Sequence, residues 1–89
     1  MKTMLEVLKG RLPDGLAIQE AKEQTQQYQI QFARDGQTVI KYLPKTCTPG
    51  MAENLADTVI WSALAHLALK VGKIEEMGRW LDKINGRGV

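Results

Sequence analysis

Cysteine, histidine and aromatic residues are scarce in this 89-residue sequence, which has two tryptophans, two tyrosines and one phenylalanine. The single cysteine, Cys47, cannot close an internal disulfide, so the chain is not a disulfide-stapled secreted scaffold. His66 is the only histidine, and with one cysteine it supplies neither a convincing zinc site nor a histidine-based catalytic triad. The sequence therefore predicts a non-enzymatic protein with no cofactor and no metal ion.

An excess of charge of one sign is also missing. Twelve lysines and arginines stand against ten acidic residues, a net charge of +2. This field is too weak to indicate nucleic acid or an anionic membrane by charge alone. The longest uncharged run, 58–69, is too short to span a bilayer, and the first residues lack the apolar core of a signal peptide. We expect a soluble cytoplasmic protein, with no membrane partner and no small-molecule substrate.

The uncharged run 58–69 lies in a predicted helix that must be covered on several sides, because it is apolar almost all round. We expect this helix to begin at Pro49 with Thr48 as its N-cap, and to end at Gly72. A second helix follows over 74–84. Its apolar stripe consists of Ile74, Met77, Leu81 and Ile84.

Residues 28–43 alternate between apolar and polar side chains around Asp35-Gly36, which predicts a β-hairpin. Two registers are open. A three-residue loop would pair Tyr28 with Tyr42 and gather most large apolar residues on one face, whereas a two-residue loop would pair Tyr28 with Leu43. We favour the three-residue loop for this reason.

The other segments complete a small single domain over 1–89. Residues 3–12 have the spacing of a short amphipathic helix. Residues 16–27 have helical composition but strand-like alternation at their start, and we favour a polar edge strand. With a linker at 44–49 and a frayed tail at 86–89, the predicted class is α+β: a short N-terminal helix, a two- or three-stranded antiparallel sheet, and a C-terminal helical hairpin packed on the sheet.

The last two helices resemble one tetratricopeptide-repeat hairpin. The positions that carry the resemblance are Trp61, Leu64, Ala65, Ala68, Gly72, Ile74, Met77, Leu81 and Ile84. The chain departs from that family at Met77 and Ile84, where alanine is usual, and at Ala68, where an aromatic residue is usual. No second copy precedes it, and a solenoid needs about three repeats. The resemblance implies the geometry of a helix pair and not a peptide-binding superhelix.

Two surfaces are candidate interfaces. Trp80 and Met77 lie on or beside the stripe of the last helix, and an exposed tryptophan there would anchor a partner. The hairpin carries Arg34, Lys41 and Lys45 beside Tyr42, a combination of bases and an aromatic ring that can bind nucleic acid.

The first functional hypothesis is a protein-interaction module, an adaptor, inhibitor or regulator that binds another protein or forms a homodimer through its surplus apolar surface. Small accessory proteins of phages and mobile elements are of this type. The alternative is a nucleic-acid-binding accessory protein that uses the basic hairpin.

Overall fold

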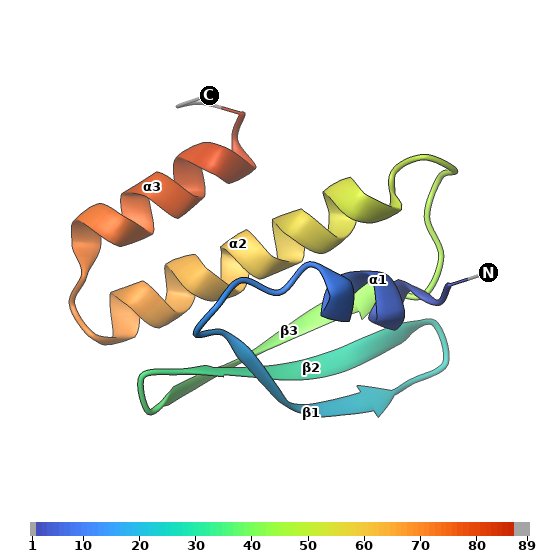
Figure 1. Ribbon diagram of the computed structural model, residues 1–89, viewed down its shortest axis with the longest axis horizontal. Helices are drawn as coiled ribbons and strands as arrows, with labels where there is room; N and C mark the ends of the chain where they lie inside the picture. The colour runs from blue at the N-terminus through green and yellow to red at the C-terminus, as the bar shows by residue number, and fades with distance from the viewer. Residues whose placement is uncertain (1, 87–89) are drawn as a thin grey trace.

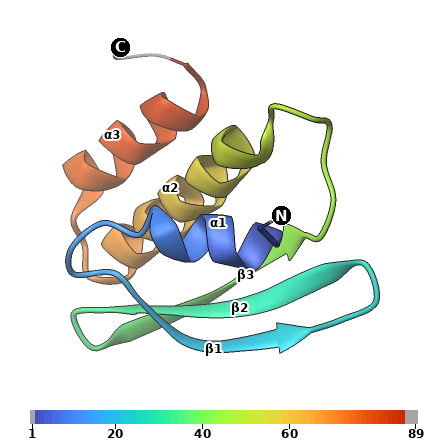
Figure 2. The same cartoon turned by 45° about the vertical axis from the view of Figure 1, so that its right-hand side comes forward.

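The computed structural model, which describes residues 2–86, confirms the α+β class. An N-terminal helix is followed by three antiparallel strands and two further helices, all packed on one face of the sheet (Figures 1 and 2). The elements are α1 (Met4–Gly10), β1 (Ala17–Glu23), β2 (Gln27–Arg34), β3 (Gln37–Pro44), α2 (Ala52–Lys70) and α3 (Ile74–Ile84).

Helix α1 begins at a capping box. The Thr3 side chain accepts a hydrogen bond from the Glu6 backbone N–H, and the Glu6 carboxylate accepts one from the Thr3 backbone in return. Met4 and Leu8 are buried in the core. Just after the helix, Arg11 lies 2.6 Å from a Glu53 oxygen of α2 and 2.7 Å from an Asp57 oxygen. These contacts fix α1 across the first half of α2.

Residues 16–27, whose composition suggested a helix, contain the strand β1, as the alternation at their start predicted. β1 pairs with β2, which gives a sheet in the order β1-β2-β3. Most β1 side chains are exposed because β1 is an edge strand, and the register shifts between Ile18 and Glu20. A polar sequence is sufficient here, since this strand has little surface to bury.

The predicted three-residue hairpin loop is wrong. The strands pair Phe32 with Val39 and Tyr28 with Leu43, as a two-residue turn requires. Both turn residues have positive φ, 52° at Asp35 and 78° at Gly36, the conformation of a tight turn that matches the twist of the strands. This register directs the Tyr42 side chain to the open face of the sheet, where it is 52% exposed.

The core lies between the sheet and α2, and α1 and α3 cover other sides of α2 (Figure 2). Its largest fully buried side chains are Phe32, Leu8, Ile30 and Leu43. On α2, Ala56 and Ala63 have no exposed surface. Their small side chains allow the helix to lie close to its neighbours.

Thr48 is not the N-cap of α2. The helix begins three residues after the predicted Pro49, and its N-cap Met51 makes no side-chain capping bond. The Met51 N–H instead donates to the Thr48 carbonyl, 3.0 Å away, and Gly50 has a φ of 85°. This turn occupies the residues that were expected to form the first helical turn, so the connection after β3 runs over 45–51.

The junction between α2 and α3 follows the prediction closely. Gly72, with a φ of 77°, ends α2, and the N–H groups of Gly72 and Lys73 donate to the carbonyls of Leu69 and Ala68. This pattern is a Schellman motif, which needs a residue of positive φ at the position of Gly72.

Of the predicted tail, all but Gly86 lies outside the described residues. No helix within 2–86 combines the length and apolar character needed to cross a membrane.

Candidate functional site

A shallow groove with a largely apolar lining lies on α2. It runs between β3 on one side and α3 on the other. Its lining comes from all three elements: Lys41 of β3, Ser62, Ala65, His66 and Leu69 of α2, and Met77 and Leu81 of α3.

The groove exists because α3 covers only part of the remaining surface of α2. The sheet and α1 cover other sides (Figure 2), while His66 and Leu69 stay exposed along the groove. Leu69 is 50% exposed although it belongs to the longest uncharged run of the sequence. An apolar helix thus keeps one uncovered strip along the groove.

Helix α3 contributes the other wall, and its apolar stripe is wider than the surface that α2 covers. Met77 and Ile84 are half-buried, but Ile74 is 55% exposed and Leu81 41% exposed. Met77 and Leu81 line the groove together with Leu69, whereas Ile74 lies in a separate depression at the start of α3, beside Glu75 and Arg79. We call Leu69, Ile74, Met77 and Leu81 the hairpin stripe.

The polar residues of the groove are basic or neutral. Lys41 and His66 line it, and the neighbouring Lys70 donates from Nζ to the Thr38 carbonyl, 2.6 Å away. Desolvation, followed by the positive charges of Lys41 and Lys70, lowers the pKa of His66 below its ordinary value of 6.5. The imidazole is therefore neutral at pH 7, and the charge of this side of the groove comes from lysine.

The depressed pKa of His66 makes stability depend on pH. Because the folded protein binds this proton less readily than the unfolded chain, stability should fall as the pH drops below 6.5 and level off below the folded pKa. NMR titration of the His66 ring tests the cause: Lys41→Gln should raise the pKa, whereas Lys22→Gln, on β1, should leave it unchanged. An unmoved pKa in Lys41→Gln would contradict the charge contribution.

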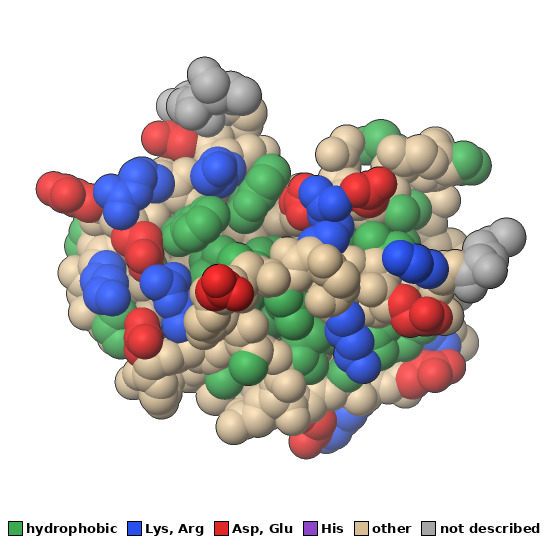
Figure 3. Space-filling view, in the orientation of Figure 1, with side chains coloured by type: hydrophobic (Ala, Val, Ile, Leu, Met, Phe, Trp, Pro, Cys, Tyr) green, Lys and Arg blue, Asp and Glu red, His purple; other side chains and the backbone are tan. Residues whose placement is uncertain are grey.

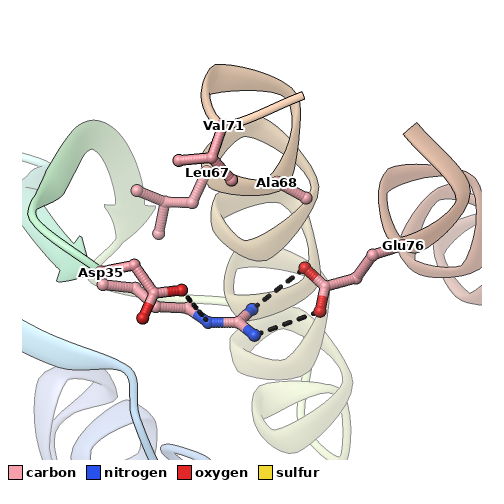
Figure 4. Close-up of a pocket in the computed structure, with 6 residues that line it drawn as sticks. Asp35, Leu67, Ala68, Val71 and Glu76 are labelled. Atoms are coloured by element: carbon pink, nitrogen blue, oxygen red, sulfur yellow. Dashed lines mark hydrogen bonds and ion pairs between the residues drawn. The ribbon is translucent and has the colours of Figure 1, made fainter. Parts of the chain in front are cut away.

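Arg34, predicted as a nucleic-acid contact, binds the protein itself. Its guanidinium lies between β2 and α3 and donates to both carboxylate oxygens of Glu76, at 3.1 and 3.4 Å (Figure 4). A third contact, of 3.6 Å, joins it to Asp35. The Arg34 and Glu76 side chains are only 23% and 20% exposed, so this pair ties α3 to the end of the hairpin.

Lys45 is engaged in a similar way. Its Nζ lies 2.7 Å from a Glu23 oxygen of β1 and 5.6 Å from the centre of the Tyr28 ring. Lys41 projects on the helix-covered side of the sheet, because it pairs with the buried Ile30, while Tyr42 projects on the open side. The structure therefore does not bring the three bases and Tyr42 together on one surface.

Figure 3 shows the charge distribution on the face that carries α1. Acidic and basic side chains alternate there, with hydrophobic side chains between them. A phosphate backbone requires an extended basic surface. The mixture of charges on the face shown provides no such surface.

Trp80 is half-buried and packs against the core. Lys83 Nζ lies 5.8 Å from the centres of both the Trp80 and the Trp61 rings. The Trp80 Nε1 atom is buried, and within residues 2–86 it has no hydrogen-bond acceptor. Trp80 thus holds α3 against α2. Of the two interface residues predicted on the last helix, Trp80 and Met77, only Met77 lines the groove.

The sequence placed Ile74 and Leu81 on the apolar stripe of the last helix and named Lys41 as an interface candidate, but it did not identify Leu69, Ile74 and Leu81 as exposed contact residues. The available signal was the spacing of Ile74 and Leu81, which are seven residues apart and lie toward the flank of the α3 stripe. Periodicity identifies an apolar face, but it does not say how much of that face a neighbouring helix covers.

In the part of the chain that the structure describes, no cluster of three or more histidine, cysteine, aspartate or glutamate side chains is arranged to hold a metal ion. Comparisons with protein-family models, with curated proteins and with solved structures found no match.

Proposed function

We propose that this protein is a non-enzymatic interaction module, a small cytoplasmic adaptor, inhibitor or regulator of the type carried by phages and mobile elements. The observation that supports the proposal is the exposure of Leu69 and Leu81, which line one groove, and of Ile74, which lies two turns before Leu81 on the same side of α3. Side chains of this size contribute little to stability when half of their surface stays in water. Clustered on a groove, they are the usual composition of a helix-binding or interface surface.

Nucleic-acid binding, the alternative, has less support. Two of its three bases, Arg34 and Lys45, are already neutralised by Glu76 and Glu23. Breaking either ion pair to reach a phosphate would cost part of the free energy gained. The remaining base, Lys41, lies beside apolar residues in the groove. We therefore place the function on the helical hairpin.

A photoreactive amino acid at position 74 tests the interaction surface in the native host cell. It should give a discrete cross-linked product, and Leu81→Glu in the same chain should abolish that product by placing a charge in the stripe. Since Leu81 is exposed, its replacement should change the free energy of unfolding by less than about 1 kcal/mol, as circular dichroism can verify.

The matched control is the same amino acid at position 22, on β1, where Lys22 is exposed. It should give no product that depends on Leu81. Equal products from positions 74 and 22, or no product from position 74, would contradict the proposal.

A further inference from the structure

We infer that the outer edge of β3 binds an extended acidic segment of a partner protein, which joins the sheet as a fourth, antiparallel strand. The inference rests on the proposed function, since it names the chemistry of the partner that occupies the same groove. It is supported by the backbone groups along β3, by the apolar groove beside them, and by the charge of Lys41 at their junction.

The backbone groups of every second residue of β3 point away from β2. In a two-residue hairpin the pair next to the turn exchanges hydrogen bonds, and bonded and unbonded pairs alternate from there. Thr38, Ile40 and Tyr42 therefore do not bond to β2, and the Thr38 carbonyl instead accepts a hydrogen bond from Lys70 of α2. Because the described part of the sheet ends at β3, the N–H and C=O groups of Ile40 and Tyr42 have no strand to pair with.

The other edge of the sheet, β1, is protected against such pairing. Its register shifts between Ile18 and Glu20, and three of its seven residues are charged. Irregular pairing and charge are the usual means by which edge strands avoid adding a further strand. β3 pairs without a shift and carries only one charged residue, Lys41. It is therefore the edge that is open to a fourth strand.

The groove lies directly beside this edge. Lys41 forms its β3 side, projecting on the helix-covered side of the sheet, and α3 forms the opposite wall. A strand added to β3 would direct every second side chain toward the same side. Apolar side chains there would lie toward Leu69 of α2 and Leu81 of α3, which are both exposed. The added strand would thus cover the uncovered strip of α2.

Charge complementarity selects an acidic segment. Within residues 2–86 Lys41 has no ion-pair partner, whereas Arg34 and Lys45 each have one, and the described lining of the groove contains no acidic residue. Lys70 adds a second positive charge near His66. On an added strand, a carboxylate opposite Lys41 would form an ion pair beside the apolar groove. An inward-pointing lysine on an edge strand also disfavours strands with an apolar or basic residue at that position.

A second copy of this chain fits the edge less well. Two β3 strands that pair antiparallel are related by a two-fold axis perpendicular to the sheet, so the helices of both copies lie on the same side. Lys41 of each copy then approaches Lys41 and Lys70 of the other. Like charges close together across a strand pair are destabilising, whereas an acidic strand replaces this repulsion by attraction.

A synthetic peptide, acetyl-Thr-Leu-Val-Glu-Val-Leu-Thr-amide, tests the inference. Its glutamate and leucines share one face, and its valines share the other. With the glutamate opposite Lys41, the valines lie opposite Ile40 and Tyr42, and their N–H groups point at β3. Binding should slow hydrogen exchange of the Ile40 and Tyr42 amides at least about tenfold, measured by NMR. The Lys41 amide, which already bonds to β2 opposite Ile30, should change little.

Matched peptides and variants separate backbone pairing from charge. N-methylation of both valines removes the donors that face β3 and should abolish binding, whereas N-methylation of both leucines, whose N–H groups point away, should preserve it. Lys41→Glu should weaken binding at least about tenfold and should create binding of a peptide with lysine in place of glutamate. Lys22→Glu makes the same change of charge on β1 and should leave binding of the original peptide unchanged.

No binding of the glutamate peptide at millimolar concentration would overturn the inference. Equal binding of the two N-methylated peptides, or of the glutamate and lysine peptides by the wild type, would also overturn it. A wild-type dimer whose Ile40 and Tyr42 amides are protected without peptide would assign the edge to a second copy. These failures are distinct from failure of the proposed function: a cross-link from position 74 to another protein, without peptide binding, would keep the function and remove only the added strand.

Discussion

Replacing Phe32 by alanine is expected to lower the free energy of unfolding by about 3–5 kcal/mol, the usual loss for a fully buried phenylalanine. Phe32 has no exposed surface, lies in the central strand, and pairs with Ile18 on one side and Val39 on the other. A domain of this size has a total stability of about 4–13 kcal/mol. Urea denaturation followed by circular dichroism should therefore show a variant close to the limit of folding.

Tyr42→Ala is the matched control, because it removes an aromatic ring from the open face of the same sheet. Its expected cost is no more than about 1 kcal/mol. In the three-residue-loop register, Tyr42 would share the face of Phe32 and its removal would be costly. Similar losses for the two variants would thus contradict the two-residue turn at Asp35-Gly36.

The hairpin shows how far local sequence determines this fold. Alternation located both strands, and Asp35-Gly36 located the turn. Two effects compete to set the register of the strands: the gathering of apolar residues on one face, which favours a three-residue loop, and the backbone conformation of the turn. The turn decides the register, because aspartate and glycine both tolerate the positive φ that a two-residue turn requires. As a consequence of this register, the side chains of Ile40 and Tyr42 remain exposed on the open face of the sheet.

The candidate site was harder to predict because its residues interact across long sequence separations. Arg34 is 42 residues from Glu76, and Lys45 is 22 residues from Glu23. From the sequence alone, both bases counted as available for a ligand. Only the packing of α3 and β1 shows that these charges are already compensated.

Trp80→Ala should release α3 from the domain. No residue within α3 is fully buried, so its attachment depends on half-buried contacts, of which Trp80 is the largest, and on the Arg34–Glu76 pair. We expect a loss of about 2–3 kcal/mol, somewhat below the range for a fully buried tryptophan. Amide hydrogen exchange should accelerate more in α3 than in β2. The variant should also lose binding of its partner, because α3 carries Ile74, Met77 and Leu81 of the hairpin stripe. Trp80 itself is not part of that stripe.

Trp80→Phe separates packing from hydrogen bonding at the same position. The buried Nε1 has no acceptor within residues 2–86, and an unsatisfied buried donor costs about 1–3 kcal/mol. Phenylalanine removes this donor and keeps part of the apolar contact, so the two effects should nearly cancel and leave stability within about 1 kcal/mol of the wild type. A loss as large as that of Trp80→Ala would show that the indole N–H has a partner in solution. Slow amide exchange retained in α3 of Trp80→Phe would confirm that apolar packing holds this helix, and with it the docking surface.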